Sequence, residues 1–185
     1  MPYKLFIVSI LALLLGGCAG TWTRVDNTNA HYTDPRYELD LPDGWVRVKV
    51  FETLYVTRDG VGVQQISVAF REHEKAFENS EQDAGTDLLP AELADRYIAE
   101  MKASDSNGLP SLEVLSNSPS TVDGHDAFRL HVRFVSHDGL RYERIAHGFA
   151  TDAGFYLVTY QAPTLHFFER DQLTYQQLLN SFKAG

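Results

Sequence analysis

Residues 127–136 read Ala-Phe-Arg-Leu-His-Val-Arg-Phe-Val-Ser, with apolar and polar side chains in alternation. Because successive strand residues point to opposite faces of a sheet, this stretch predicts a long strand with one apolar face. Asp138-Gly139 then forms a hairpin turn, and residues 142–150 return as the neighbouring strand. The C-terminal part of the sheet is therefore expected to be antiparallel.

Similar signals predict strands and helices on both sides of this hairpin. Upstream, an acidic polar loop over residues 72–89 precedes a helix that begins at Pro90 and continues to about Ala103. The expected order is four strands, a helix, four strands and a closing helix, which indicates an α+β domain built on a mainly antiparallel sheet. The other elements are expected at 37–41, 45–50, 51–57, 63–70, 112–117, 155–161 and, for the closing helix, 166–182.

Both ends of this pattern resemble the PsbP/Mog1-like proteins. Residues 37–45, Tyr-Glu-Leu-Asp-Leu-Pro-Asp-Gly-Trp, are similar to the extended strand and Pro-x-Gly-Trp opening of that group. Residues 156–163 and 178–182 resemble its last strand and the Ser-Phe helix end. The resemblance implies an antiparallel sheet sandwiched by helices, an α/β/α sandwich. Known members are mostly adaptors and assembly factors, so no catalytic residue is carried over.

The apolar faces of these elements predict which side chains are buried. The run from 128 to 134 presents its apolar residues on one side and Arg129, His131 and Arg133 on the other. The expected core residues are Trp45, Val48, Phe70, Tyr97, Leu130, Val132, Phe134, Leu157 and Phe182.

The N-terminus has the pattern of a lipoprotein signal peptide. Lys4 precedes an apolar run that is too short to span a membrane, and Leu15-Gly16-Gly17-Cys18 resembles the bacterial lipobox. Residues 1–17 are then the signal, and Cys18 is the lipid-attachment residue. The alternative is an ordinary secretory signal that is cleaved nearby, with Cys18 incidental.

Residues 18–36 are expected to be a lipidated cysteine followed by a flexible polar tether, and residues 37–183 the single folded domain. Trp22 could bury in that domain or sit at the membrane interface. Ala19 follows Cys18, so no aspartate stands where it would retain a lipoprotein at the inner membrane. We therefore expect lipid anchoring to the outer membrane of a bacterium, on its periplasmic face.

The charge and the cysteine content of the chain exclude several classes of function. The chain carries 16 basic and 25 acidic residues, a net charge of -9, which argues against nucleic-acid binding. One cysteine excludes an internal disulfide framework and any multi-cysteine metal site.

No catalytic or cofactor-binding motif is found. Histidines 131 and 137 share a strand face but lie too far apart to share one zinc ion, while His131 and His147 could approach only if the hairpin register allowed it. No Gly-x-Ser-x-Gly motif occurs, and acidic residues 72–83 lack the spacing of a calcium loop. We expect no metal site, no cofactor and no catalytic residues.

The candidate binding residues are Arg129, His131, Arg133 and Arg144, with Arg141 nearby on the same hairpin. Such a cationic strip could accept an anion or an acidic partner. The alternative is cross-strand ion pairing with Glu143.

The sequence therefore predicts a membrane-anchored envelope lipoprotein that acts as a non-catalytic adaptor or assembly factor, with another envelope protein as its partner. Two alternatives stay open. One is a carrier of a small apolar ligand in a cavity between sheet and helices, and the other is a hydrolase with an unrecognised site.

Overall fold

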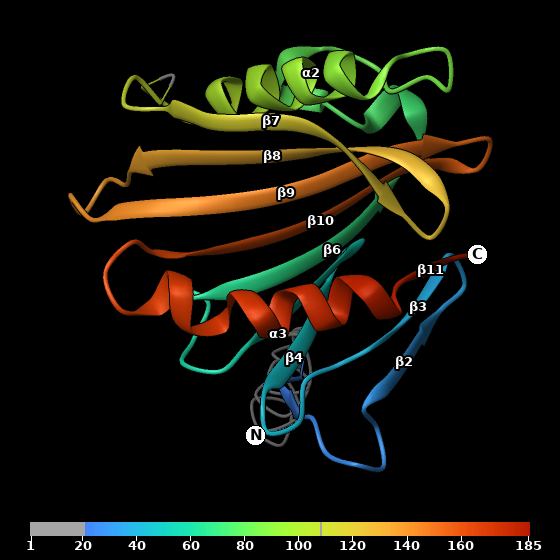
Figure 1. Cartoon of the computed structure of the whole chain (residues 1–185), viewed down its shortest axis with the longest axis vertical. Helices are drawn as coiled ribbons and strands as arrows, with labels where there is room; N and C mark the ends of the chain where they lie inside the picture. Colours follow the sequence, from blue (N-terminus) through green and yellow to red (C-terminus); the bar gives the residue numbers. More distant parts are fainter. Residues whose placement is uncertain (1–20, 108) are drawn as a thin grey trace, which may run out of the picture.

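The computed structural model describes residues 21–107 and 109–185, which form two sheets and two long helices (Figure 1). Neighbouring strands pair antiparallel in both sheets. The main sheet has eight strands, in the spatial order β1 (Thr23–Arg24), β4 (Val46–Val50), β5 (Thr53–Thr57), β6 (Gln65–Arg71), β10 (Gly154–Pro163), β9 (Arg141–Thr151), β8 (His125–Val135) and β7 (Glu113–Val122). The small sheet has the order β11 (Lys183–Ala184), β3 (Tyr37–Asp40) and β2 (His31–Asp34).

Helices cover opposite faces of the main sheet. α2 (Pro90–Ala103) packs on β7, β8 and β9, whereas α3 (Phe167–Ser181) packs on β10 and on β3 of the small sheet (Figure 1). The expected fold class, an α+β domain with a mainly antiparallel sheet between helices, is confirmed. Both helices lie within one residue of their predicted bounds.

Local signals explain why these elements begin and turn where they do. Pro90 suits the first position of α2, and the Glu92 carboxylate accepts a hydrogen bond of 2.8 Å from the Leu89 backbone N–H. The β7–β8 hairpin turns on Asp123-Gly124, where both residues have positive φ angles of 49° and 81°. Asp and Gly tolerate that conformation, which matches the twist of the flanking strands.

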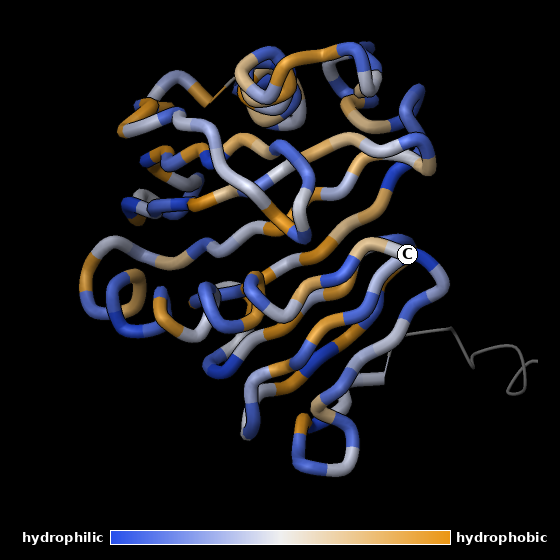
Figure 2. The backbone as a smooth tube through the Cα atoms, turned by 45° about the vertical axis from the view of Figure 1, so that its right-hand side comes forward, coloured by the Kyte–Doolittle hydropathy of each residue, from blue (hydrophilic) through white to orange (hydrophobic). Residues whose placement is uncertain are grey.

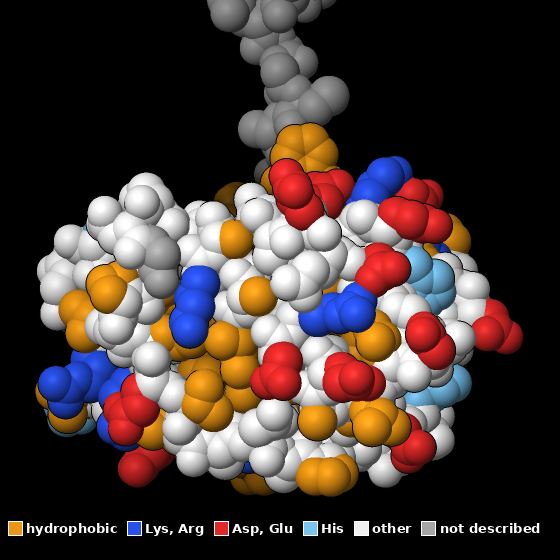
Figure 3. Space-filling view, turned by 90° about the horizontal axis from the view of Figure 1, so that it is seen from above, with side chains coloured by type: hydrophobic (Ala, Val, Ile, Leu, Met, Phe, Trp, Pro, Cys, Tyr) orange, Lys and Arg blue, Asp and Glu red, His pale blue; other side chains and the backbone are white. Residues whose placement is uncertain are grey.

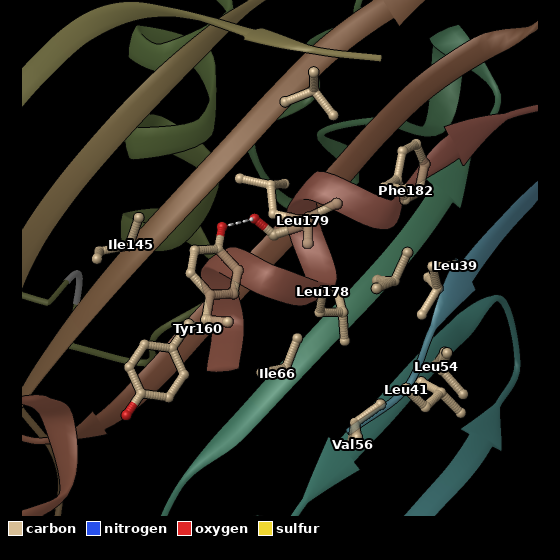
Figure 4. Packing of buried hydrophobic residues seen from close by; sticks show 14 of the residues in the cluster. Leu39, Leu41, Leu54, Val56, Ile66, Ile145, Tyr160, Leu178, Leu179 and Phe182 are labelled. Carbon is tan, nitrogen blue, oxygen red and sulfur yellow. Dashed lines mark hydrogen bonds between the residues drawn. The ribbon is translucent and has the colours of Figure 1, made fainter. Parts of the chain in front are cut away.

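Each face of the main sheet contributes to a separate hydrophobic core, and apolar residues recur along the strands of the sheet (Figure 2). Leu178 and Leu179 of α3 lie over Ile66 and Tyr160 in the first core (Figure 4). The second core lies between α2 and β8. Of the nine predicted core residues, eight are buried, and Leu157 is half-buried and packs against the second core.

A buried carboxylate joins α3 to the connection between β5 and β6. Asp171 accepts hydrogen bonds from Gln64 at 3.1 Å, Arg58 at 2.8 Å and Arg170 at 2.8 Å. A buried charge costs little when its oxygens are fully paired, as they are here. This cluster fixes the start of α3 and is structural.

The predicted tether at residues 18–36 is wrong for the part that the structure describes. Thr23 and Arg24 pair with β4, Val25 is 0% exposed, and residues 31–34 form β2. The two residues of β1 gain a partner only from β4, more than twenty residues later, and so carry little signal of their own. β2 pairs with the neighbouring β3, but its polar composition hid it. The folded domain therefore begins at Thr23 instead of Tyr37.

Two further expectations need correction. The strand at 37–41 joins the small sheet with β2 and β11 and not the main sheet. The acidic loop at 72–89 contains two short 3₁₀ helices, η1 (His73–Lys75) and η2 (Glu78–Ser80). Within the described ranges no helix has the length and apolar character needed to cross a membrane.

Candidate functional site

The register of β8 and β9 divides the predicted cationic strip between the two faces of the sheet. Arg133 lies opposite Glu143, and Val132 lies opposite Arg144. Directly opposite residues share a face, so Arg144 lies on the α2 face with Val132, away from the other three residues. The strip of four residues is therefore wrong as a unit, because its assignment depended on a register that the sequence does not fix.

Arg144 has a structural role on the α2 face. Its Nε donates to the Gln161 side chain at 2.9 Å, and its Nη1 donates to the Tyr97 hydroxyl of α2 at 3.0 Å. The guanidinium also lies over the Phe134 ring, 5.5 Å from its centre. These contacts satisfy Arg144 between helix and sheet.

Two members of the strip pair with Glu143, as the ion-pairing alternative expected. The buried Glu143 carboxylate lies 2.7 Å from Nε2 of His131 and accepts from Nη2 of Arg133 at 3.1 Å. The His131 ring also stacks on Phe168 of α3, with ring centres 5.3 Å apart. His131 and Arg133 are therefore held by protein contacts.

Arg129 is different, because it forms no ion pair or side-chain hydrogen bond with any described residue. It is half-buried and lies between Ser118 of β7 and His147 of β9 on the α3 face. The hydroxyls of Ser116, Ser118 and Ser120 likewise form no hydrogen bond with the described residues. All three face the same side as Arg129.

We call Arg129 with Ser116, Ser118 and Ser120 the Arg129 face. A free guanidinium can donate two parallel hydrogen bonds to a carboxylate or phosphate, and hydroxyls one strand away can add further donors. The strand predicted at 112–117 is too short to include Ser118 and Ser120, which belong to β7. The alternation Ser116-x-Ser118-x-Ser120 was the available signal, since it has the period of a strand.

His147 lies beside Arg129 but is enclosed. Its Nδ1 is 2.7 Å from the Tyr175 hydroxyl, which donates to the Val158 carbonyl at 3.1 Å. The Tyr175 oxygen therefore accepts from a neutral His147 ring. Burial, with a smaller contribution from the positive charge of Arg129, lowers the pKa of His147 to about 4.

Three further features considered for the site are the pair of histidines, a metal ion and Cys18. His131 lies opposite Ile145 and not His147, so the register does not bring the two histidines opposite one another. Across residues 21–107 and 109–185, no cluster of three or more His, Cys, Asp or Glu side chains could hold a metal ion. Cys18, with the rest of the lipobox, lies outside the described residues.

Aromatic side chains fill the layer between α3 and the sheet. Tyr160 stacks on Phe168 and Tyr175 with ring centres 5.4 and 5.7 Å apart, and Phe149 stacks on Tyr156 at 5.1 Å. An apolar ligand between α3 and these strands would have to displace these rings. On the face seen from above, acidic and basic side chains are interspersed (Figure 3).

Solved structures place this architecture among the PsbP/Mog1-like folds. The chain is similar to the cyanobacterial PsbP of Synechocystis, with a TM-score of 0.53, 15% identity, and 92% of this chain and 95% of that one covered. It is also similar to the protein Mog1, with a TM-score of 0.52, 10% identity, and 89% and 95% covered.

A further similar structure comes from Bacteroides thetaiotaomicron, with a TM-score of 0.55 and 11% identity. The match covers 84% of this chain but only 48% of that larger protein. No curated protein matches the sequence. Residues 28–184 match the family model described as PsbP, and the chain belongs to the PsbP family.

Proposed function

We propose that this protein is a lipid-anchored, non-catalytic adaptor of the bacterial envelope that binds an acidic segment of another envelope protein at the Arg129 face. The observation that carries the proposal is the half-buried guanidinium of Arg129, which has no partner among the described residues. Partly desolvated cations are normally paired, so an open one suits an external anion. Membership of the PsbP family, with its adaptor-type relatives, is consistent with a binding role.

The strand nearest to the lipid-attachment residue and the strands of the Arg129 face lie at opposite edges of the sheet, which supports this proposal. The chain leaves the lipid-attachment residue Cys18 and enters the sheet at β1, at one edge, whereas Ser118 and Arg129 lie on β7 and β8 at the other. Eight strands have seven spacings of about 4.8 Å, so the two edges are about 34 Å apart along the sheet. Attachment at β1 therefore leaves the Arg129 face free for a partner.

Replacing Arg129 tests the binding role. A photo-crosslinking side chain at Ser118 should capture one envelope protein in intact cells, and Arg129→Ala should abolish that crosslink. Loss of a charge-assisted hydrogen bond weakens binding by about 1.5–3 kcal/mol, on the order of ten- to hundred-fold. The matched control is Arg24→Ala, which removes an exposed guanidinium at the opposite edge. An unchanged crosslink in Arg129→Ala would refute the proposed site.

Anchoring is tested at Cys18. Cys18→Ser should leave unprocessed precursor and remove all labelling by a fatty-acid probe, because the thiol is the atom that accepts the lipid. Wild-type protein should fractionate with the outer membrane on a sucrose gradient, and protease should reach it only after the periplasm is opened. Normal labelling of Cys18→Ser would contradict lipid attachment, and wild-type protein in inner-membrane fractions would contradict the location.

A further inference from the structure

The short distance between the lipid-attachment residue and the first strand restricts where the domain can lie. Four residues, 19–22, separate Cys18 from Thr23, the first residue of β1. A fully extended chain spans at most about 3.6 Å per residue, so the Cα of Thr23 lies within about 18 Å of that of Cys18. A domain held by a lipid on Cys18 must therefore rest close to the membrane surface, with β1 toward it.

Exposed apolar side chains gather near this entry point. Thr23 lies opposite Arg47, and the same register places Trp22 opposite Val48. Trp22 is 48% exposed, and Val50, two residues further along β4, is 41% exposed. Residues two apart on a strand share a face and lie about 7 Å apart. In Figure 3 a hydrophobic side chain, with acidic side chains beside it, lies where the described part of the chain begins.

The hairpin after β4 extends this apolar group. Phe51 and Glu52 connect β4 to β5, and Phe51 is 92% exposed with a φ angle of 51°. This left-handed conformation favours Gly, Asn or Asp, so a phenylalanine there is unfavourable in both backbone conformation and hydration. Such a residue at the tip of a hairpin indicates that its side chain serves a contact outside the fold.

The charges around the hairpin are neutralised within the domain. Lys49 is paired with Asp34, and Glu52 is paired with Arg36. Attraction of one sign of charge is therefore weak at this place. The exposed side chains Trp22, Val50 and Phe51 are apolar, and two of them are aromatic. Side chains of this kind insert at the boundary between lipid headgroups and acyl chains.

We propose that Trp22, Val50 and Phe51 form a membrane-contact tip that inserts into the lipid leaflet holding the acylated Cys18. The inference rests on the lipid anchor of the proposed function, since the reach of the chain is what brings the tip to a bilayer. A second contact beside the lipid anchor would fix the orientation of the domain and turn the Arg129 face, at the far edge of the sheet, away from the anchor.

Environment-sensitive labelling of the lipidated protein tests the tip. Cys18 is the only cysteine of the sequence and is blocked by the lipid, so Phe51→Cys introduces the one free thiol. The full lipoprotein, with a fluorescent dye on that thiol, is reconstituted into vesicles of phosphatidylethanolamine and phosphatidylglycerol. We expect a blue-shifted emission and iodide quenching that is severalfold weaker than for a dye at an exposed position far from β1 in the same vesicles.

The matched control is Leu173→Cys, which labels another exposed apolar residue, 70% exposed on the outer side of α3. Its dye should be quenched by iodide in these vesicles as strongly as the free dye in buffer. A second variant, Phe51→Gly, relieves the positive φ angle and should not lower the stability of the fold. It should nevertheless make a dye on Val50→Cys more accessible to iodide, because the anchoring ring is gone.

The outcomes separate this inference from the proposed function. An acylated protein whose dye on Phe51→Cys is quenched as strongly as the dye on Leu173→Cys overturns the membrane contact alone. A protein that carries no fatty acid on Cys18 overturns the lipid anchor, and the membrane contact with it.

Discussion

Phe149→Ala should lower the free energy of unfolding by about 3–5 kcal/mol, as expected when a large buried aromatic side chain is truncated. Phe149 is fully buried, and its ring packs on those of Tyr156 and Phe182 at 5.1 and 6.1 Å. These contacts join β9, β10 and the end of α3, so a cavity there would loosen the sheet from the helix. Urea unfolding followed by circular dichroism measures the change.

The chain offers a matched control for this substitution. Phe51→Ala removes the same atoms from a side chain that is almost fully exposed, and an exposed change of this kind is usually within about 0.5 kcal/mol. Similar losses of stability in Phe149→Ala and Phe51→Ala would contradict the packing described here.

His147 should make the fold sensitive to acid. Its pKa in the folded protein is lowered to about 4 from an ordinary value of 6.5, because protonation would place a charge among buried groups. Between these two values the unfolded chain binds the proton and the folded chain does not, so stability is lost as the pH falls from about 6.5 toward 4. The loss from this residue should reach about 3 kcal/mol.

The variant His147→Asn isolates this contribution. An asparagine amide can still donate to the Tyr175 hydroxyl from near the position of Nδ1, but it does not titrate. Unfolding free energies at several pH values should therefore fall less steeply for His147→Asn than for the wild type, while carboxylates contribute equally to both. Parallel pH profiles would show that His147 is not the titrating group.

Strand periodicity and turn residues were sufficient to predict most of the fold. The alternation at residues 128–134 predicted which side chains of β8 would be buried, because a strand with one apolar face has only one favourable orientation on a core. Pro90 marked the start of α2, and Asp138-Gly139 marked the hairpin between β8 and β9. These signals are local, and each lies within a few residues of the structure it specifies.

The candidate site could be predicted only in part, because it depends on pairing between strands. Arg129, His131 and Arg133 were correctly grouped on one face by their spacing along a single strand. The position of Arg144 and the partners of Glu143 required the register between β8 and β9. A shift of one residue would have moved every side chain of β9 to the other face.

Most of the elements, the buried face of β8 and the grouping of Arg129 with its strand neighbours could be predicted from the sequence, because they follow from periods of two or 3.6 residues and from turn chemistry. The tertiary structure was needed to show that residues 23–24 and 31–34 belong to the fold. It was also needed to show that Arg129 lies beside three serines without a partner among the described residues, and that Phe51 is exposed in the hairpin after β4. The partner of β1, the cross-strand neighbours of Arg129 and the exposure of Phe51 depend on segments distant in sequence, whose pairing is selected by packing of the whole domain. β2 pairs locally with β3 but lacks the apolar alternation that marks a strand.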